Sequence, residues 1–288
     1  MLTLLEAATQ DKVVVVQDRR ATVDIESHSV FTRERGAFQR MRQHLAGYRH
    51  RDNFRDRRLS NDYGIGEQGP ATRHIWYTGE NLRPPVGWDL TLSFDTDRLD
   101  GANHYLPHWA IRTGVLSGPD QRDLMSVGEQ TYREGRNNPR IPPKFACVLA
   151  SNPHPMRDQI AEALGEVGHV ERFGRAYGKP VQSKNELLKQ YRYCITPEND
   201  LYPGYVTEKP FEAWLTGTVP IWWGLDPNGH LDQGALLNVA TEGLAGTAEA
   251  VANMETSADI WARMVSRSLL KRSYDYEALI TFVASRIC

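Results

Sequence analysis

Residues 145–223 alternate short apolar runs with amphipathic stretches, and this alternation restricts the possible fold more than any other feature of the chain. The runs FACVLA, HVERF, RYCIT and VPIWW are short and rich in aromatic and β-branched residues, which is typical of buried strands. Between them, MRDQIAEALGEV, SKNELLKQY and TEKPFEAWLT predict helices. Strands and helices that alternate at this spacing form a parallel, doubly wound sheet, so we expect an α/β fold.

The first half of the chain also contains strand-like runs. Residues 12–17 (KVVVVQ), 73–78 (RHIWYT) and 89–94 (DLTLSF) predict strands, and residues 137–144 (NNPRIPPK) have the three prolines of a linker. We therefore expect two α/β domains, residues 1–140 and 141–288, with helices from residue 257 closing the second. A cleft between two such domains is a common place for a small-molecule site.

Composition excludes some classes of function. The 288 residues include 34 Lys and Arg against 36 Asp and Glu, so the net charge of -2 gives no general attraction to nucleic acid or to an anionic membrane. Cys147, Cys194 and Cys288 are far apart, and the first two lie in apolar runs, which favours buried thiols in a reducing compartment. No apolar run is long enough to span a bilayer and no signal peptide is evident, so we expect a cytoplasmic protein.

The segment YVTEKPFEAWLTGT has the features of a helix start. Thr207 fits the N-cap position, Pro210 suits the first turn, and Glu208 and Lys209 lie where the positive end of the helix favours an anion such as a diphosphate. A surface cap with charges spaced four residues apart explains the same pattern. Spacing alone leaves these two interpretations open.

Residues 197–224, PENDLYPGYVTEKPFEAWLTGTVPIWWG, resemble the donor-binding motif of the α-1,3-fucosyltransferases, the bacterial type of glycosyltransferase family 10. Three further segments resemble the same family in the same order: WYTGENLRPP, FACVLASNPHPMRDQIAEAL and VERFGRAYGK. The resemblance covers residues 74–225, about half of the chain. It implies a GT-B architecture, in which two Rossmann-like domains face across a cleft and GDP-fucose binds to the C-terminal one.

The resemblance also implies roles for single residues in donor binding. Glu198 and Asn199 would face the sugar hydroxyls, and Tyr205 would lie against the donor. Glu208 would bind the ribose and Lys209 the phosphate.

Other residues match the family's catalytic and phosphate-binding positions. Glu80, in the Thr-Gly-Glu-Asn segment, matches the proposed general base of an inverting transfer to an acceptor hydroxyl. Arg157 matches an arginine that contacts the donor diphosphate. Arg175 and Lys179 would add positive potential, although a solvated loop explains them equally well.

One position departs from the family. Pro197 stands where the family has Phe before Glu-Asn, which removes a ring beside the sugar and makes the identity of the donor less certain than the place of its site. Two alternatives therefore stay open: the same fold with another nucleotide-sugar donor, or a protein that binds a nucleotide sugar without catalysis. The acceptor, an oligosaccharide or a glycolipid, and the oligomeric state are not fixed by the sequence.

No obligatory metal is expected. Asp95 and Asp97 form an Asp-x-Asp motif, but it follows a strand of the acceptor half and three-residue motifs are frequent by chance. His104 and His108 are four residues apart, but Pro107 argues against one continuous helical face. Nucleic-acid binding would need a basic domain, which the near-neutral net charge does not support.

The stretch from Arg33 to Arg58 holds nine Arg, one Glu and two Asp, a balance of nine minus three, or +6. A solvated helix and loop is one interpretation; a surface that attracts an anionic glycan or lipid head group, with the protein peripheral at a membrane, is the other.

If the stretch attracts the acceptor, changing Arg49, Arg51, Arg55, Arg57 and Arg58 to Gln will raise KM and flatten the salt dependence for an anionic acceptor only. Transfer to neutral and anionic acceptors across a salt series measures this. Equal effects on both acceptors, or none on either, would leave the stretch as a solvated surface.

Overall fold

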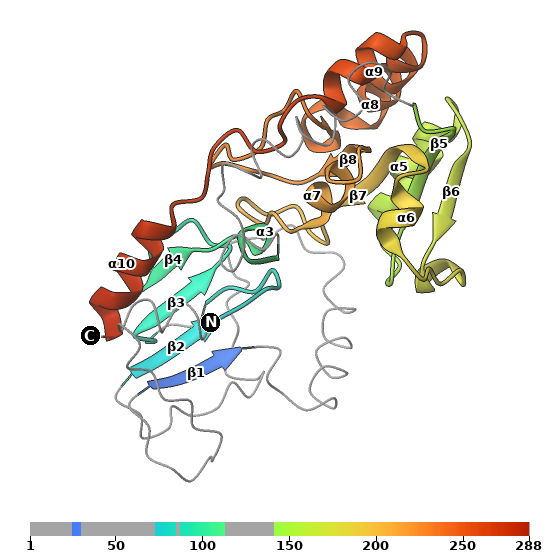
Figure 1. The fold of residues 1–288 in the computed structure, drawn as a ribbon. Helices are drawn as coiled ribbons and strands as arrows, with labels where there is room; N and C mark the ends of the chain where they lie inside the picture. Colours follow the sequence, from blue (N-terminus) through green and yellow to red (C-terminus); the bar gives the residue numbers. More distant parts are fainter. Residues whose placement is uncertain (1–24, 30–72, 85–86, 113–140, 288) are drawn as a thin grey trace. The chain divides into compact units, whose positions relative to one another are not determined.

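The computed structural model describes residues 25–29, 73–84, 87–112 and 141–287. The chain divides into two compact units, drawn in Figure 1. Unit 1 comprises Met1–His108, Tyr202–Gly204 and Asp275–Cys288, and unit 2 comprises Trp109–Leu201 and Tyr205–Tyr274. The predicted domain boundary at residue 140 is at the end of residues 113–140, which lie outside the described residues, so it stays a prediction. The stretch from Arg33 to Arg58 also lies outside the described residues, as do the strand predicted at 12–17 and Cys288.

Unit 2 contains a five-stranded sheet in which every pair of neighbouring strands is parallel, in the order β6-β5-β7-β8-β9. Its strands are β5 (Lys144–Leu149), β6 (Val170–Phe173), β7 (Tyr191–Pro197), β8 (Val219–Trp223) and β9 (Leu237–Asn238). Its helices are α5 (Pro155–Gly165), α6 (Lys184–Leu188), α7 (Lys209–Trp214), α8 (Val239–Glu255) and α9 (Ala258–Val265), with a 3-10 turn η3 (Arg175–Tyr177). The predicted α/β fold with alternating strands and helices is confirmed.

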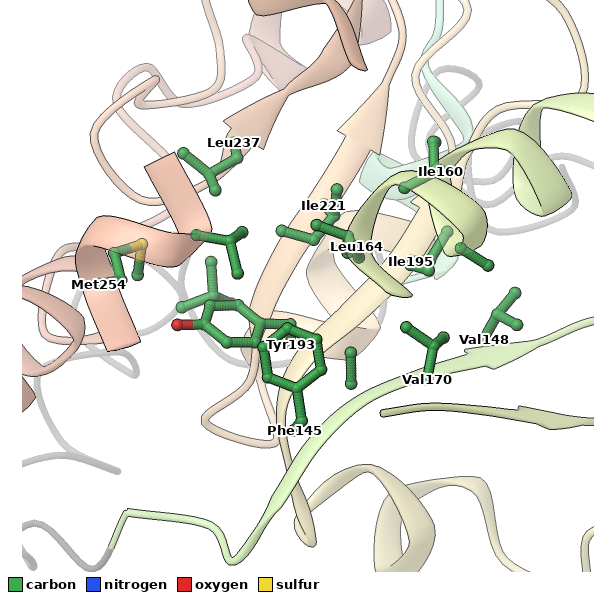
Figure 2. Packing of buried hydrophobic residues seen from close by; sticks show 14 of the residues in the cluster. Phe145, Val148, Ile160, Leu164, Val170, Tyr193, Ile195, Ile221, Leu237 and Met254 are labelled. Carbon is green, nitrogen blue, oxygen red and sulfur yellow. The ribbon is translucent and has the colours of Figure 1, made fainter. Parts of the chain in front are cut away.

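Two apolar clusters cover the sheet of unit 2. The larger one joins strand residues such as Val148 and Ile195 to α5, α8 and α9; Figure 2 shows Ile160 and Leu164 of α5 and Met254 of α8 packed over the strands. The smaller one joins Cys147 and Cys194 to residues of α6 and α7. Both thiols are buried and free, and their burial was predicted. In the register of the sheet, Cys147 of β5 lies opposite Cys194 of β7.

Unit 1 contains a four-stranded parallel sheet in the order β1-β2-β3-β4. The strands are β1 (Ile25–Ser29), β2 (Arg73–Tyr77), β3 (Leu90–Ser93) and β4 (Asn103–Tyr105). Helix α10 (Tyr276–Ile287) belongs to this unit, where the ring of Phe282 lies 5.0 Å from that of His104 and the Arg286 guanidinium donates to the Gly101 carbonyl at 2.6 Å. A short helix, α3 (His108–Arg112), follows β4. The predicted strands β2 and β3 are confirmed, whereas β1 and β4 were not predicted.

The parallel arrangement of unit 2 brings the carboxyl ends of β5, β7 and β8 to one edge of the sheet. Open α/β sheets bind ligands beyond this edge. The polar residues that follow β5 and β7, from Ser151 to His154 and from Glu198 to Asp200, therefore lie at the edge where a ligand is expected. Within the described part of the chain, no helix is both long and apolar enough to cross a bilayer.

Candidate functional site

Glu198, the first residue after β7, is the centre of the polar cluster at this edge. Its side chain is fully buried, with 0% of its surface exposed. Oε1 accepts from the Thr207 backbone N–H at 2.9 Å and from Trp222 Nε1 at 3.2 Å. Oε2 accepts from Thr207 Oγ1 at 2.7 Å and from Lys209 Nζ at 3.0 Å. A buried carboxylate thus has two donors on each oxygen, as burial of a charge demands.

These bonds fix the loop between β7 and α7. The Glu198 N–H donates to the Trp223 carbonyl at 3.0 Å and so extends the ladder between β7 and β8 by one residue. Helix α7 begins at Lys209, and Glu208 occupies the N-cap position. Thr207, predicted as the N-cap, lies one residue earlier because its hydroxyl donates to Glu198, although it also accepts from the Lys209 N–H at 3.4 Å.

Two cations meet at Asn199. Its side-chain oxygen accepts from Lys209 Nζ at 3.2 Å and from Arg157 Nη2 at 3.0 Å. Arg157, on the first turn of α5, also donates from Nη1 to the Asn152 carbonyl at 2.7 Å and is 8% exposed. Burial lowers the pKa of Arg157, an effect that Tyr177 and Glu198 oppose, but an arginine remains a cation near neutral pH. The Glu198 carboxylate compensates one of the two cations and the Asn199 amide oxygen is neutral, so the cluster keeps a net positive charge and favours an anionic ligand.

His154 connects α5 to the loop after β7. It is the N-cap of α5: Nδ1 accepts from the Met156 N–H at 3.3 Å, and Nε2 lies 3.1 Å from the Asn199 carbonyl oxygen. Burial lowers the pKa of His154, and the nearby charges of Arg157 and Lys209 lower it further, against the raising effect of the Asn199 carbonyl. The neutral ring is therefore the form that caps the helix.

The structure thus joins four of the predicted donor-site residues in one hydrogen-bonded network: Arg157, Glu198, Asn199 and Lys209. The family resemblance predicted that the Glu198 side chain faces sugar hydroxyls. In the structure this side chain is buried and bonded to Thr207, Trp222 and Lys209 instead.

The other predicted residues of unit 2 differ in exposure. Tyr205 is buried at 2% exposure, and Glu208 is half-buried beside Lys209. Arg175, on η3, and Lys179 are exposed.

Glu80 belongs to unit 1, where it follows β2. Thr78 Oγ1 donates to the Glu80 carbonyl and accepts from the Glu80 N–H, each at 3.0 Å, and the Leu82 N–H donates to the same carbonyl at 2.7 Å. The Gly-Glu-Asn segment is therefore a defined turn with a half-buried Glu80.

The Asp-x-Asp motif has a structural role in unit 1. Asp95 Oδ1 accepts from the Asp97 N–H at 3.1 Å, and Asp97 Oδ1 accepts from the Leu99 N–H at 3.0 Å. Asp95 Oδ2 also lies 3.1 Å from Arg83 Nη1. These aspartates hold backbone turns and an ion pair. Among the described residues, no group of three or more His, Cys, Asp or Glu side chains is placed to hold a metal ion.

Sequence reasoning missed His154 and Trp222. A His before Pro155, at the start of an amphipathic stretch, was a detectable cap signal, since the imidazole nitrogen can accept a backbone bond as Asn does. The indole donor of Trp222 had no such signal, because an apolar strand residue gives no indication of which buried acceptor it will meet.

Comparisons with known proteins show which families this chain is similar to. Residues 142–240 match the family model described as "Glycosyltransferase family 10 (fucosyltransferase) C-term". The α-(1,3)-fucosyltransferase FucT of Helicobacter pylori is 30% identical over 180 residues, which cover 53% of this chain and 37% of that protein. The mouse 4-galactosyl-N-acetylglucosaminide 3-α-L-fucosyltransferase 9 is 29% identical over 85 residues, 28% of this chain and 24% of that protein. The matched regions thus span about a third and a quarter of these two relatives.

Solved structures share the fold over nearly the whole chain. A crystal structure of α1,3-fucosyltransferase with GDP-fucose has a TM-score of 0.64 at 18% identity, covering 100% of this chain and 97% of that one. The structure with GDP has the same TM-score at 19% identity. The fold is of the GT-B type. Residues 142–240 are thus similar to the C-terminal part of glycosyltransferase family 10.

The His154 cap makes stability depend on pH. Because the folded pKa of His154 is lowered, the unfolded chain binds the proton more readily, and this contribution to stability is full above the ordinary pKa of 6.5 and is lost as the pH falls below it. We expect His154→Asn, which keeps a cap acceptor but does not titrate, to lose less stability than the wild type between pH 7.5 and 5.5. Urea denaturation at both pH values measures this. An equal loss in the two proteins would contradict it.

Proposed function

We propose that this protein is an inverting glycosyltransferase that transfers L-fucose from GDP-fucose to a hydroxyl of a glycan acceptor. The observation that carries the proposal is the meeting of Arg157 and Lys209 on Asn199 at the carboxyl edge of the sheet. All three residues lie within residues 142–240, which match the fucosyltransferase family model. The structural relatives with GDP-fucose and GDP support the choice of donor.

The cations suit the donor's diphosphate. Arg157 would contact phosphate oxygens through its planar guanidinium and Lys209 through its ammonium. The phosphate oxygens would replace the neutral amide oxygen of Asn199 as a partner of both cations, while Lys209 keeps its ion pair with Glu198. Glu208 would accept hydrogen bonds from the ribose hydroxyls, and Tyr205 would lie against the donor. Arg175 and Lys179 would add positive potential from an exposed turn.

The reaction needs a base and a stabilised leaving group. The acceptor oxygen attacks C1 of fucose while the bond from C1 to the diphosphate oxygen breaks, and GDP leaves with that electron pair. Glu80 takes the proton of the acceptor hydroxyl, and the configuration at C1 inverts because attack and departure occur on opposite faces. Arg157 and Lys209 stabilise the charge that develops on the leaving diphosphate. No enzyme-bound sugar intermediate forms.

Pro197 favours a second candidate, the same chemistry with another nucleotide sugar. It is buried at the end of β7, paired with Trp223, where the resembling family has a Phe whose ring could pack near the sugar. Release of the nucleoside diphosphate, followed across a series of donors, distinguishes the candidates. GDP-fucose is expected to turn over fastest; a faster donor would correct its identity and keep the fold and site.

The diphosphate assignment predicts that Lys209→Ala and Arg157→Ala each weaken GDP binding. Each removes a cation, and a hydrogen bond to a charged group is worth roughly 1.5 to 3 kcal/mol, or about 10 to 150-fold in Kd. Isothermal titration calorimetry with GDP measures the loss. Lys189→Ala is the matched control, because Lys189 pairs with Glu186 on the exposed side of α6. Unchanged affinity in both site variants would remove the diphosphate from this cluster.

The assignment of the base predicts a different pattern for Glu80→Gln. The variant keeps its fold and its GDP affinity, because the Thr78 side chain and backbone bonds hold the turn and Gln has the size of Glu. Transfer falls by about 10² or more, the scale of a positioned general base. Glu162→Gln, at an exposed position of α5, is the control. Near-normal turnover by Glu80→Gln would show that another residue is the base.

A further inference from the structure

We propose that Glu198 is a positioning residue of the donor site: it does not touch the sugar, and it acts by holding Lys209 and the loop of residues 198–209 in the geometry that binds a diphosphate. This role rests on the proposed function. It replaces the sugar contact that the sequence suggested for Glu198. The number of its hydrogen bonds, its burial and the residues that it joins support this role.

A count of hydrogen-bond positions excludes the sugar contact. A carboxylate has about four lone-pair positions, two on each oxygen. In Glu198 all four are taken by protein donors, from Thr207, Trp222 and Lys209. The side chain is also 0% exposed. A sugar hydroxyl could reach it only by displacing one of these donors.

Glu198 orders Lys209 before the ligand arrives. A lysine side chain has a long flexible stem, and fixing it on binding costs conformational entropy. Here the ammonium already donates to Glu198 Oε2 and to Asn199 Oδ1, which uses two of its three N–H groups. Its side chain is 22% exposed, against 0% for Glu198, so the ammonium lies between the interior and the solvent. Such preorganisation raises affinity without a new contact.

The same carboxylate fixes the second cation indirectly. Glu198 ties the end of β7 to Trp222 of β8 and to Thr207, just before α7. Asn199 is the next residue, so the fixed backbone determines where its side chain meets Arg157. The chain of contacts runs from Glu198 to Lys209, Asn199 and Arg157.

Glutamine has the size of glutamate but cannot perform this task. In one orientation the NH₂ group of a Gln would face the Thr207 N–H and Trp222 Nε1, which can only donate. In the other it would face the Thr207 hydroxyl, which can turn to accept, and the Lys209 ammonium, which cannot. Lys209 would also lose its buried counter-charge. We expect Glu198→Gln to release the ammonium from its position while Lys209 itself remains.

The experiment measures Kd for GDP and for GDP-fucose with the full chain, by calorimetry. The proteins are the wild type, Glu198→Gln, Lys209→Met and the double variant. We expect Glu198→Gln to weaken both ligands equally, by about tenfold or more, since the role concerns the diphosphate that they share. In the Lys209→Met background, Glu198→Gln should weaken GDP binding by a clearly smaller factor than in the wild type, because only its indirect effect on Asn199 and Arg157 remains.

Three outcomes would overturn the role. If Glu198→Gln weakens only GDP-fucose, Glu198 contacts the sugar. If it weakens GDP by the same factor in the wild type and in Lys209→Met, it does not act through Lys209. If the wild type does not bind GDP, the proposed function fails and this role fails with it. GDP binding that Glu198→Gln leaves unchanged overturns this role alone.

A second pair of variants decides the matter if Glu198→Gln does not fold, as judged by circular dichroism. Thr207→Val keeps the shape of the side chain but removes its hydroxyl donor to Glu198, whereas Thr207→Ser keeps that donor. We expect the Val variant to bind GDP about threefold or more weakly than the Ser variant. Equal affinities of the two folded variants would overturn the role.

Discussion

The burial of one carboxylate, that of Glu198, is the constraint on which the site depends. An ionised group removed from water is strongly unfavourable unless donors surround it. The chain meets this requirement with a backbone N–H, a hydroxyl, an indole and an ammonium, which come from three residues: Thr207, Lys209 and Trp222. Satisfying the carboxylate therefore brings the end of β7, the start of α7 and the strand β8 into one arrangement.

The rest of the site follows from that arrangement and from the parallel sheet. Because β5 and β7 are parallel neighbours, the loops that follow them begin at the same edge, and His154 of one reaches the carbonyl of Asn199 in the other. Arg157 lies on the first turn of the helix that His154 caps, where it meets the side chain of Asn199. The sheet brings the two loops together, and the polar bonds set the positions of the cations at their ends.

Much of this could be predicted from the sequence, for physical reasons. The apolar runs of unit 2 are buried strands because a parallel sheet covered on both faces needs continuous apolar residues, and Cys147 and Cys194 are buried neighbours within it. The cations Arg157 and Lys209 were found through the motifs around them. The interior position of Glu198 was not, because its burial depends on Trp222 and Lys209, whose positions are fixed only by tertiary structure. Thr207 is another example, because Thr is a common N-cap residue. Its hydroxyl instead donates to the carboxylate of Glu198, nine residues earlier, and Glu208 is the N-cap of α7.

The central claim is that Arg157 and Lys209, ordered by Glu198, hold a diphosphate at the carboxyl edge of the sheet. The most direct measurement is a crystal structure of the full chain with GDP. The account predicts diphosphate oxygens within about 3 Å of Lys209 Nζ and of the Arg157 guanidinium, with the four donors of Glu198 unchanged. A diphosphate bound away from both cations, or a Glu198 side chain turned out to contact the nucleotide, would contradict it.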